Sequence, residues 1–321
     1  TPDQIQERAK AEGVTGYGGW SRDLGLGPGP GRVLRFRVPE GQTVVAFSSG
    51  SLLNLAQGRF GPYRASDVRW LAVLGMDHGV VAVRRDSPHK TLGQLLDALR
   101  AQPKAVVFGA GGSIGSQDWM KAALLARAAG VSHKEMRFVA FEGGGEALSA
   151  MTGRHVHVLA GDVAEVGRYL DQGAEIRVLA TLSAQRLGGR WANVPTAREQ
   201  GFDVRWPIVR GLYMGPRVSD RDLREWSDSL ARAMAHPTVA RELASVGMEP
   251  AWVTGPELQR FIQEEVARHK QLAAEFGDAV QGEREPPVRM GDEAQIAARA
   301  AGAATPGLRI ALVELGATPE A

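Results

Sequence analysis

Residues 106–116 read VVFGAGGSIGS, and residues 138–147 read FVAFEGGGEA. Each stretch is an apolar run that ends in a glycine-rich turn before a helix-like segment. Glycine lets the backbone approach a ligand closely, and the start of a helix offers free N–H donors to an anion. We therefore predict that the two turns lie on neighbouring strands and form one side of a pocket for a small carboxylate.

Strand and helix patterns alternate outward from these turns. Strands are predicted at 43–47, 68–74, 80–84, 105–108, 136–140, 155–159 and 176–181. Helices are predicted at 118–129, 145–152 and 163–171, and further helices follow residue 219 and residue 256. Such alternation with short loops is typical of an α/β protein with mainly parallel sheets that helices cover on both faces.

Composition narrows the function classes. A chain of 321 residues with 44% hydrophobic and 23% charged residues is typical of a globular protein with two domains or one large interrupted domain. The absence of cysteine excludes disulfides, thiol nucleophiles and cysteine-based metal sites. No apolar run reaches the roughly 20 residues that span a bilayer, and no basic cluster is interleaved with aromatic residues. We expect neither membrane insertion nor nucleic-acid binding.

Each candidate residue also has a purely structural explanation. Ser113 and Ser116 would equally well cap the helix that follows them, and Asp162 begins a helix as an N-cap residue would. The sequence GAGGSIG at 109–115 also permits a dinucleotide site, but the following strand leads into Glu142 through another glycine turn. His155 and His157 alternate on one strand without an evident third metal ligand. No serine lies in a nucleophile elbow.

Several blocks of the sequence resemble one known family. They are VPEGQT at 38–43, AFSSGS at 46–51, FGAGGSIGS at 108–116, FEGGGEA at 141–147, VLAGD at 158–162, LATLSAQR at 179–186 and NVPTAREQG at 193–201. In these blocks the chain resembles the periplasmic solute receptors of tripartite tricarboxylate transporters, the Bug or TctC-like family. The resemblance extends over residues 38–277, and more weakly over 24–37.

The resemblance implies a two-lobed, type II periplasmic-binding-protein (Venus-flytrap) fold with a ligand cleft. Lobe one would comprise residues 1–84 plus 216–321, and lobe two residues 85–215, with 278–305 as a linker-like extension. Family members begin with a strand and a PFPPGG turn, which this sequence lacks. The first strand is therefore missing, or residues 308–315 near the other end supply it.

The function implied is that of a receptor, not an enzyme, which binds a small carboxylate and delivers it to the membrane components of a tripartite tricarboxylate transporter. The ligand would be a di- or tricarboxylate, an amino acid or an aromatic acid. We expect a periplasmic monomer whose signal peptide has been removed, with no cofactor and no metal. The expected ligand-binding residues are Ser48, Ser49, Ser51, Gly109, Ala110, Gly111, Ser113, Ser116, Phe141, Gly143, Gly144 and Asp162.

Two alternatives remain open. A two-lobed α/β enzyme acting on a nucleotide or a phosphate-bearing substrate would use the same glycine turns. A degenerate receptor that no longer binds a solute would explain the atypical ends of the sequence. No lysine or arginine lies in the matched turns, so the receptor hypothesis predicts recognition by backbone N–H groups, hydroxyls and ordered water.

Overall fold

The computed structural model describes residues 43–277, in which strands and helices alternate. The strands are β1 (Val44–Ser48), β2 (Arg69–Arg84), β3 (Val107–Gly111), β4 (Arg137–Phe141), β5 (Val158–Asp162), β6 (Ile176–Thr181), β7 (Pro207–Met214) and β8 (Glu249–Val253). The helices are α2 (Ser49–Ala56), α3 (Leu92–Ala101), α4 (Gln117–Ala128), α5 (Gly144–Thr152), α6 (Val163–Asp171), α7 (Asp220–Met234), α8 (Pro237–Ser245) and α9 (Gly255–Glu275). Short 3₁₀ turns lie at Ala65–Asp67, Gly189–Trp191 and Arg198–Gln200.

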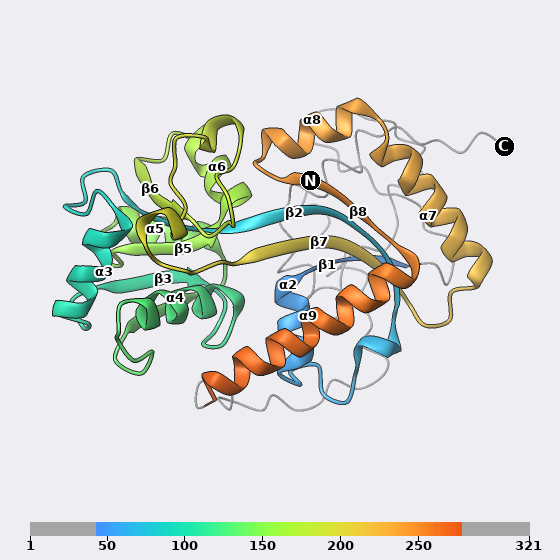
Figure 1. Ribbon diagram of the computed structural model, residues 1–321, viewed down its shortest axis with the longest axis horizontal. Coiled ribbons are helices and arrows are strands. Elements are labelled where there is room, and N and C mark those ends of the chain that lie inside the picture. Colours follow the sequence, from blue (N-terminus) through green and yellow to red (C-terminus); the bar gives the residue numbers. More distant parts are fainter. Residues whose placement is uncertain (1–42, 278–321) are drawn as a thin grey trace, which may run out of the picture. The chain divides into compact units, whose positions relative to one another are not determined.

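The long strand β2 belongs to two sheets, and Figure 1 shows it running beside β7. From Arg69 to His78 it pairs with β7, which also pairs with β1, and it pairs with β8 on its other side. From Gly79 to Arg84 it pairs instead with β5 and β6. Beyond β5 lie β3 and then β4. One unbroken strand therefore connects the two sheets.

The sequence pattern predicted mainly parallel sheets, and this part of the prediction is wrong. Only the pairs β3–β4 and β3–β5 are parallel among the named strands of the described chain. β2 runs opposite to each of its four partners, and β1 runs opposite to β7. The reason is that β2 passes from one sheet into the other without turning. In the second sheet it therefore runs antiparallel to β5 and β6.

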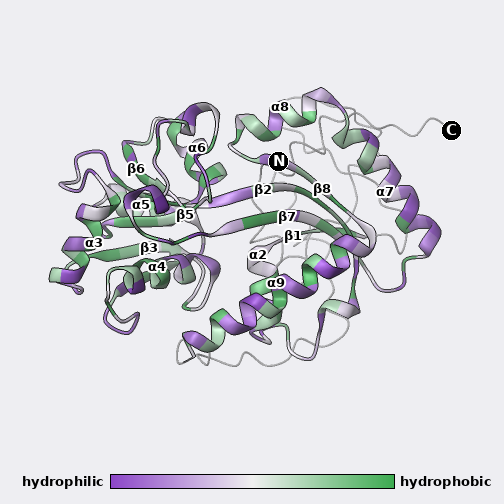
Figure 2. Ribbon diagram, viewed as in Figure 1, coloured by the Kyte–Doolittle hydropathy of each residue, from purple (hydrophilic) through white to green (hydrophobic). Residues whose placement is uncertain are grey.

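Two predicted strands, 68–74 and 80–84, are parts of β2. The intervening residues look polar in the sequence, and Figure 2 shows a hydrophilic interruption partway along the strand. Asp77 within it is nevertheless fully buried, and its side chain is ion-paired with Arg210. A buried charge with a partner can continue a strand where a solvated one would end it.

Apolar side chains from both faces of the sheets form the cores. The largest cluster packs α3 and α4 against β3, with Leu92, Leu96, Phe108 and Met120 among its fully buried members. A second cluster packs α5 and α6 on the other face, through Met151, Leu159 of β5 and Val166. A third cluster joins α2 and α9 to β2 and β7 through Leu52, Val73 and Leu258. The parallel strands thus carry helices on both faces, as predicted.

The N-terminal ends of the helices follow local sequence rules. Thr91 caps α3, with its hydroxyl accepting a hydrogen bond from the Gln94 N–H at 3.2 Å. Ser219 caps α7 in the same way. These caps satisfy N–H groups that a helix start leaves free. The predicted strand at 308–315 and the extension from 278 lie outside the described residues, and the division into lobes at 84 and 215 stays a prediction.

Candidate functional site

The predicted serines after β1 are engaged within the protein. Ser48 caps α2, and its hydroxyl accepts from the Gly50 N–H at 3.2 Å. The Ser51 hydroxyl in turn accepts from the Ser48 N–H at 3.4 Å. The Ser49 hydroxyl is fully buried and accepts from the Val209 N–H of β7 at 3.0 Å. These side chains therefore fix the start of α2 against β7.

The first glycine turn begins later than predicted. Gly109, Ala110 and Gly111 lie in β3, and a Cβ on Gly109 would come within 2.7 Å of Val156. Gly109 is thus required by packing against the segment before β5. Gly111 borders the second glycine turn, since its added Cβ would lie 3.3 Å from the Gly144 nitrogen. The two turns are adjacent, as the sequence predicted.

The serines of this turn have structural partners. Ser116 caps α4, and its hydroxyl accepts from the Trp119 N–H at 3.3 Å. The exposed Ser113 hydroxyl accepts from Arg59 at 2.9 Å, and Arg59 also donates to the Ile114 carbonyl. In the second turn Gly143 is the N-cap of α5, and Gly144 is its first residue. Phe141 is half-buried at the end of β4, against the α5–α6 core.

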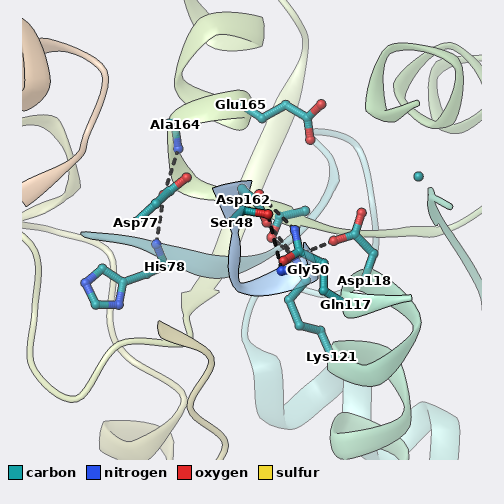
Figure 3. Close-up of polar contacts among 12 residues, drawn as sticks. Ser48, Gly50, Asp77, His78, Gln117, Asp118, Lys121, Asp162, Ala164 and Glu165 are labelled. Atoms are coloured by element: carbon teal, nitrogen blue, oxygen red, sulfur yellow. Dashed lines mark hydrogen bonds and ion pairs between the residues drawn. The ribbon is translucent and has the colours of Figure 1, made fainter. Parts of the chain in front are cut away.

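Asp162, the last predicted residue, is the centre of a buried ion-pair network. Its carboxylate accepts from Lys121 at 2.6 Å, from Arg210 at 2.6 Å and from the Gln117 amide at 3.3 Å. Figure 3 shows Gln117, Asp118 and Lys121 of α4 facing Asp162. Although Asp162 occupies the N-cap position of α6, its side chain makes no capping hydrogen bond. The capping interpretation of Asp162 is therefore wrong, and its part in ligand binding stays a prediction.

The network extends in two directions from Asp162. Arg210 also pairs with Asp77 at 2.9 Å, and both side chains are almost wholly buried. Lys121 also pairs with Asp118 at 2.7 Å and donates to the Gly161 carbonyl at 2.7 Å. Asp77 accepts in addition from the Ala164 N–H in the first turn of α6. Hence β2, β5, β7, α4 and α6 meet at one polar cluster.

Burial and charge determine the pKa values in this cluster. Burial raises the pKa of Asp118 to about 6, although Lys121 acts against this rise. Burial also raises the pKa of Glu165 to about 7, and the carboxylates of Asp162 and Asp118 add to the effect. Burial alone would raise the pKa of Asp162, but Lys121 and Arg210 outweigh it and lower the value. The acid that holds both cations therefore stays ionised.

Helix starts surround the same cluster. Gln117 begins α4, and its amide oxygen lies 3.3 Å from a Cβ built on Gly50, in the first turn of α2. A Cβ on Gly144, the first residue of α5, would overlap the Glu165 carboxylate in the first turn of α6. Four helices therefore begin around Asp162. Their N-terminal N–H groups and dipoles favour negative charge at this point.

Sequence reasoning missed Asp77, Asp118, Lys121, Glu165 and Arg210. A signal was present for Lys121, which lies three residues after Asp118 on the buried side of a helix that also carries Trp119 and Leu125. Arg210 likewise interrupts an apolar strand, IVRGLYM at 208–214. A charged residue at an otherwise buried position indicates a buried partner. Lys121 and Arg210 lie outside the matched turns, which contain no lysine or arginine, but both contact Asp162.

Two features of the described residues concern metal sites and membrane-spanning helices. No group of histidine, aspartate and glutamate side chains within 43–277 is arranged to hold a metal ion, and His157 accepts a hydrogen bond from the Val107 N–H at 3.1 Å. In the same range no helix combines the length and the apolar character that crossing a membrane requires.

The sheets and the helices around them form the two-lobed α/β fold of periplasmic binding proteins. MatC from Rhodopseudomonas palustris, solved with bound malate, has a similar fold, with a TM-score of 0.62 and 22% identity over 74% of this chain and 80% of that one. The TM-score is 0.65 for an R. palustris protein solved with adipate, at 21% identity over 73% of this chain and 78% of that one.

Residues 32–277 match the family described as "Tripartite tricarboxylate transporter family receptor", and the chain belongs to this family. A curated relative, the "UPF0065 protein in gbd 5'region" of Cupriavidus necator, is 26% identical over 77% of this chain and 74% of its own length. A separate match of 45 residues is 60% identical to the glutamate–tRNA ligase of Thermobifida fusca, and it spans only 9% of that enzyme. So short a match carries no argument for ligase activity.

Proposed function

We propose that the protein is an extracytoplasmic receptor that binds a small carboxylated solute where the helices begin around Asp162. The observation that carries the proposal is that the N-terminal turns of α2, α4, α5 and α6 lie close together. The first N–H groups of a helix have no partner within the helix, so several such ends give an anion a set of convergent donors.

The two cations that contact Asp162 are committed to acids rather than open to a ligand. Lys121 is fully buried, and Arg210 is 4% exposed, with both side chains paired to acids. The half-buried residues around the cluster include those of the glycine turns, Gly111–Gly112 and Gly143–Gly144, and Gln117 beside them. A carboxylate would therefore rest on backbone N–H groups, and Ser48, Ser49 and Asp162 would act by shaping the walls around it.

Family membership and the related structures support the same proposal. The chain belongs to the receptor family of tripartite tricarboxylate transporters, and related folds have been solved with malate and with adipate. We infer a periplasmic receptor that acts without covalent chemistry and delivers its solute to the membrane components of such a transporter. We propose as well that the receptor is a monomer and that its lobes have the boundaries predicted from the sequence.

A thermal-shift assay tests the proposal with di-, tri- and aromatic carboxylates, amino acids and nucleotides. A rise in Tm with one class of carboxylates and none with nucleotides is expected, because binding to the native state stabilises it by mass action. A shift with nucleotides alone would support the enzyme alternative and refute the receptor. Flat responses across the panel, together with native mass spectra that show no retained metabolite, would support the degenerate receptor.

A matched pair of variants locates the site. In Gly144→Val the added side chain would overlap the Glu165 carboxylate and displace it at the start of α5, so carboxylate binding should be lost. Gly188→Ala is the control, because nothing lies within 4 Å of a Cβ at that position. If both variants bind like the wild type, the ligand binds elsewhere.

A further inference from the structure

The acids of the Asp162 cluster outnumber its bases. Asp77, Asp118, Asp162 and Glu165 lie together with only Lys121 and Arg210 as cations within hydrogen-bonding distance in the described chain. Both cations are already committed to these acids and to the Gly161 carbonyl. The cluster thus has more acceptors than its cations can neutralise.

Three of the four acids are partly exposed to solvent. The side chain of Asp118 is 13% exposed, and that of Asp162 is 10% exposed. Glu165 is half-buried against the second glycine turn, and it accepts a hydrogen bond from the Tyr169 hydroxyl at 2.8 Å. Figure 3 shows the carboxylates of Glu165 and Asp118 apart from the Asp77–His78 side of the cluster. A ligand on the helix starts would meet these acceptors.

Among the buried polar atoms that lack a hydrogen-bond partner in the described chain are two from residues that contact Asp162. One is the Nε of Arg210, whose residue is 4% exposed, and the other is the amide oxygen of Gln117. Leaving a buried donor or acceptor unpaired is costly, so such atoms indicate a missing partner. The region therefore offers donors and acceptors together: N–H groups for a carboxylate, and carboxylate and amide oxygens for a donor.

We propose that the ligand of this site is a carboxylate that also carries a hydrogen-bond donor, a hydroxyl or an ammonium group, within a few bonds of the carboxylate. This inference rests on the proposed function and specifies its substrate class. The carboxylate lies on the N-terminal N–H groups of α4 and α5, and the donor faces Asp118 and Glu165. A carboxylate without a donor leaves these acids facing apolar ligand atoms, which costs binding energy.

The test uses isothermal titration calorimetry with ligand pairs that differ by one donor. The pairs are malate and succinate, citrate and tricarballylate, mandelate and phenylacetate, and aspartate and succinate. At pH 8 Glu165 is ionised, because its pKa is raised only to about 7. In every pair that binds, the dissociation constant of the ligand with the donor should be lower by a factor of about ten or more, because a hydrogen bond to a charged group contributes about that much to binding.

Variants show whether the acids cause this preference. Glu165→Gln and Asp118→Asn should each reduce the advantage of the donor ligand severalfold and leave binding of the donor-free partner equal or tighter. A purely structural defect would weaken both ligands. Glu264→Gln, an exposed acid of α9, is the matched control and should behave like the wild type.

Equal or tighter binding of the donor-free ligands would overturn this inference and leave the receptor proposal intact. Absence of binding by every carboxylate would overturn the proposed function itself, and this inference with it.

Discussion

Replacing Arg210 by methionine should destabilise the protein strongly, because Arg210 holds two buried acids. It pairs with Asp162 at 2.6 Å and with Asp77 at 2.9 Å, and Asp77 is fully buried. Methionine keeps most of the side-chain volume but leaves Asp77 without a cation. Breaking a buried pair by removing one partner costs about 3–5 kcal/mol. At about 2–4 °C per kcal/mol for a domain of this size, Tm should fall by roughly 6–20 °C.

The stability of the Arg210→Met variant should also depend on pH in a definite direction. Without Arg210 the pKa of Asp77 should rise further than burial already raises it, so the native variant binds protons more readily than the unfolded chain. Stability of the variant should therefore increase as the pH falls from 8 to 5. Urea unfolding followed by circular dichroism at both pH values measures the free energy of unfolding.

Two further variants complete the test. In Arg85→Met the lost partner is Glu175, and both side chains are largely exposed at 64% and 74%, so the change should cost under about 1 kcal/mol. Asp77→Asn combined with Arg210→Met should cost less than the sum of the single changes, because no unpaired carboxylate then remains at 77. A loss of less than about 1 kcal/mol in Arg210→Met would refute the argument.

Two more predictions concern His269 and Gly211. Burial lowers the pKa of His269 to about 4, so below pH 6.5 the unfolded state binds more protons than the native state, and stability falls as the pH decreases toward 4. His269→Leu should flatten this decline in a series of Tm measurements. An unchanged dependence of Tm on pH would contradict the argument. Gly211→Ala should lower the free energy of unfolding in urea by roughly 1–3 kcal/mol, because its Cβ would lie 2.5 Å from the Ala72 carbonyl oxygen. Gly215→Ala is the control and should change this free energy little, because nothing lies within 4 Å of a Cβ there. Equal effects of the two changes would refute the packing argument.

The elements could be predicted where local signals agree. Helix α6 and strand β6 have the predicted bounds, because an alternating apolar pattern and a terminating glycine at 173 coincide there. The two glycine turns are neighbours because β3 and β4 pair in parallel, so both strands end at the same edge. Short-range patterns therefore determined this half of the fold.

The direction of β2 could not be read from the sequence. Its polar segment at 76–78 resembles a break, and only the long-range contact between Asp77 and Arg210 shows that the strand continues. The same contact explains why the site was predicted without cations. Lys121 is 41 residues from Asp162, and Arg210 is 48 residues from it, so no local spacing connects them. Their only signal was charge at positions whose neighbours are apolar.

The continuity of β2 has a mechanical consequence. A strand shared by two hydrogen-bonded sheets cannot swing like a loop, so one sheet can turn relative to the other only if the strand itself twists. Its pairing shifts register between Trp70 and Ala72, between Val73 and Gly75, and between Val81 and Ala82. Such irregularities increase local twist, so a rotation of one sheet relative to the other would be concentrated at these positions of β2.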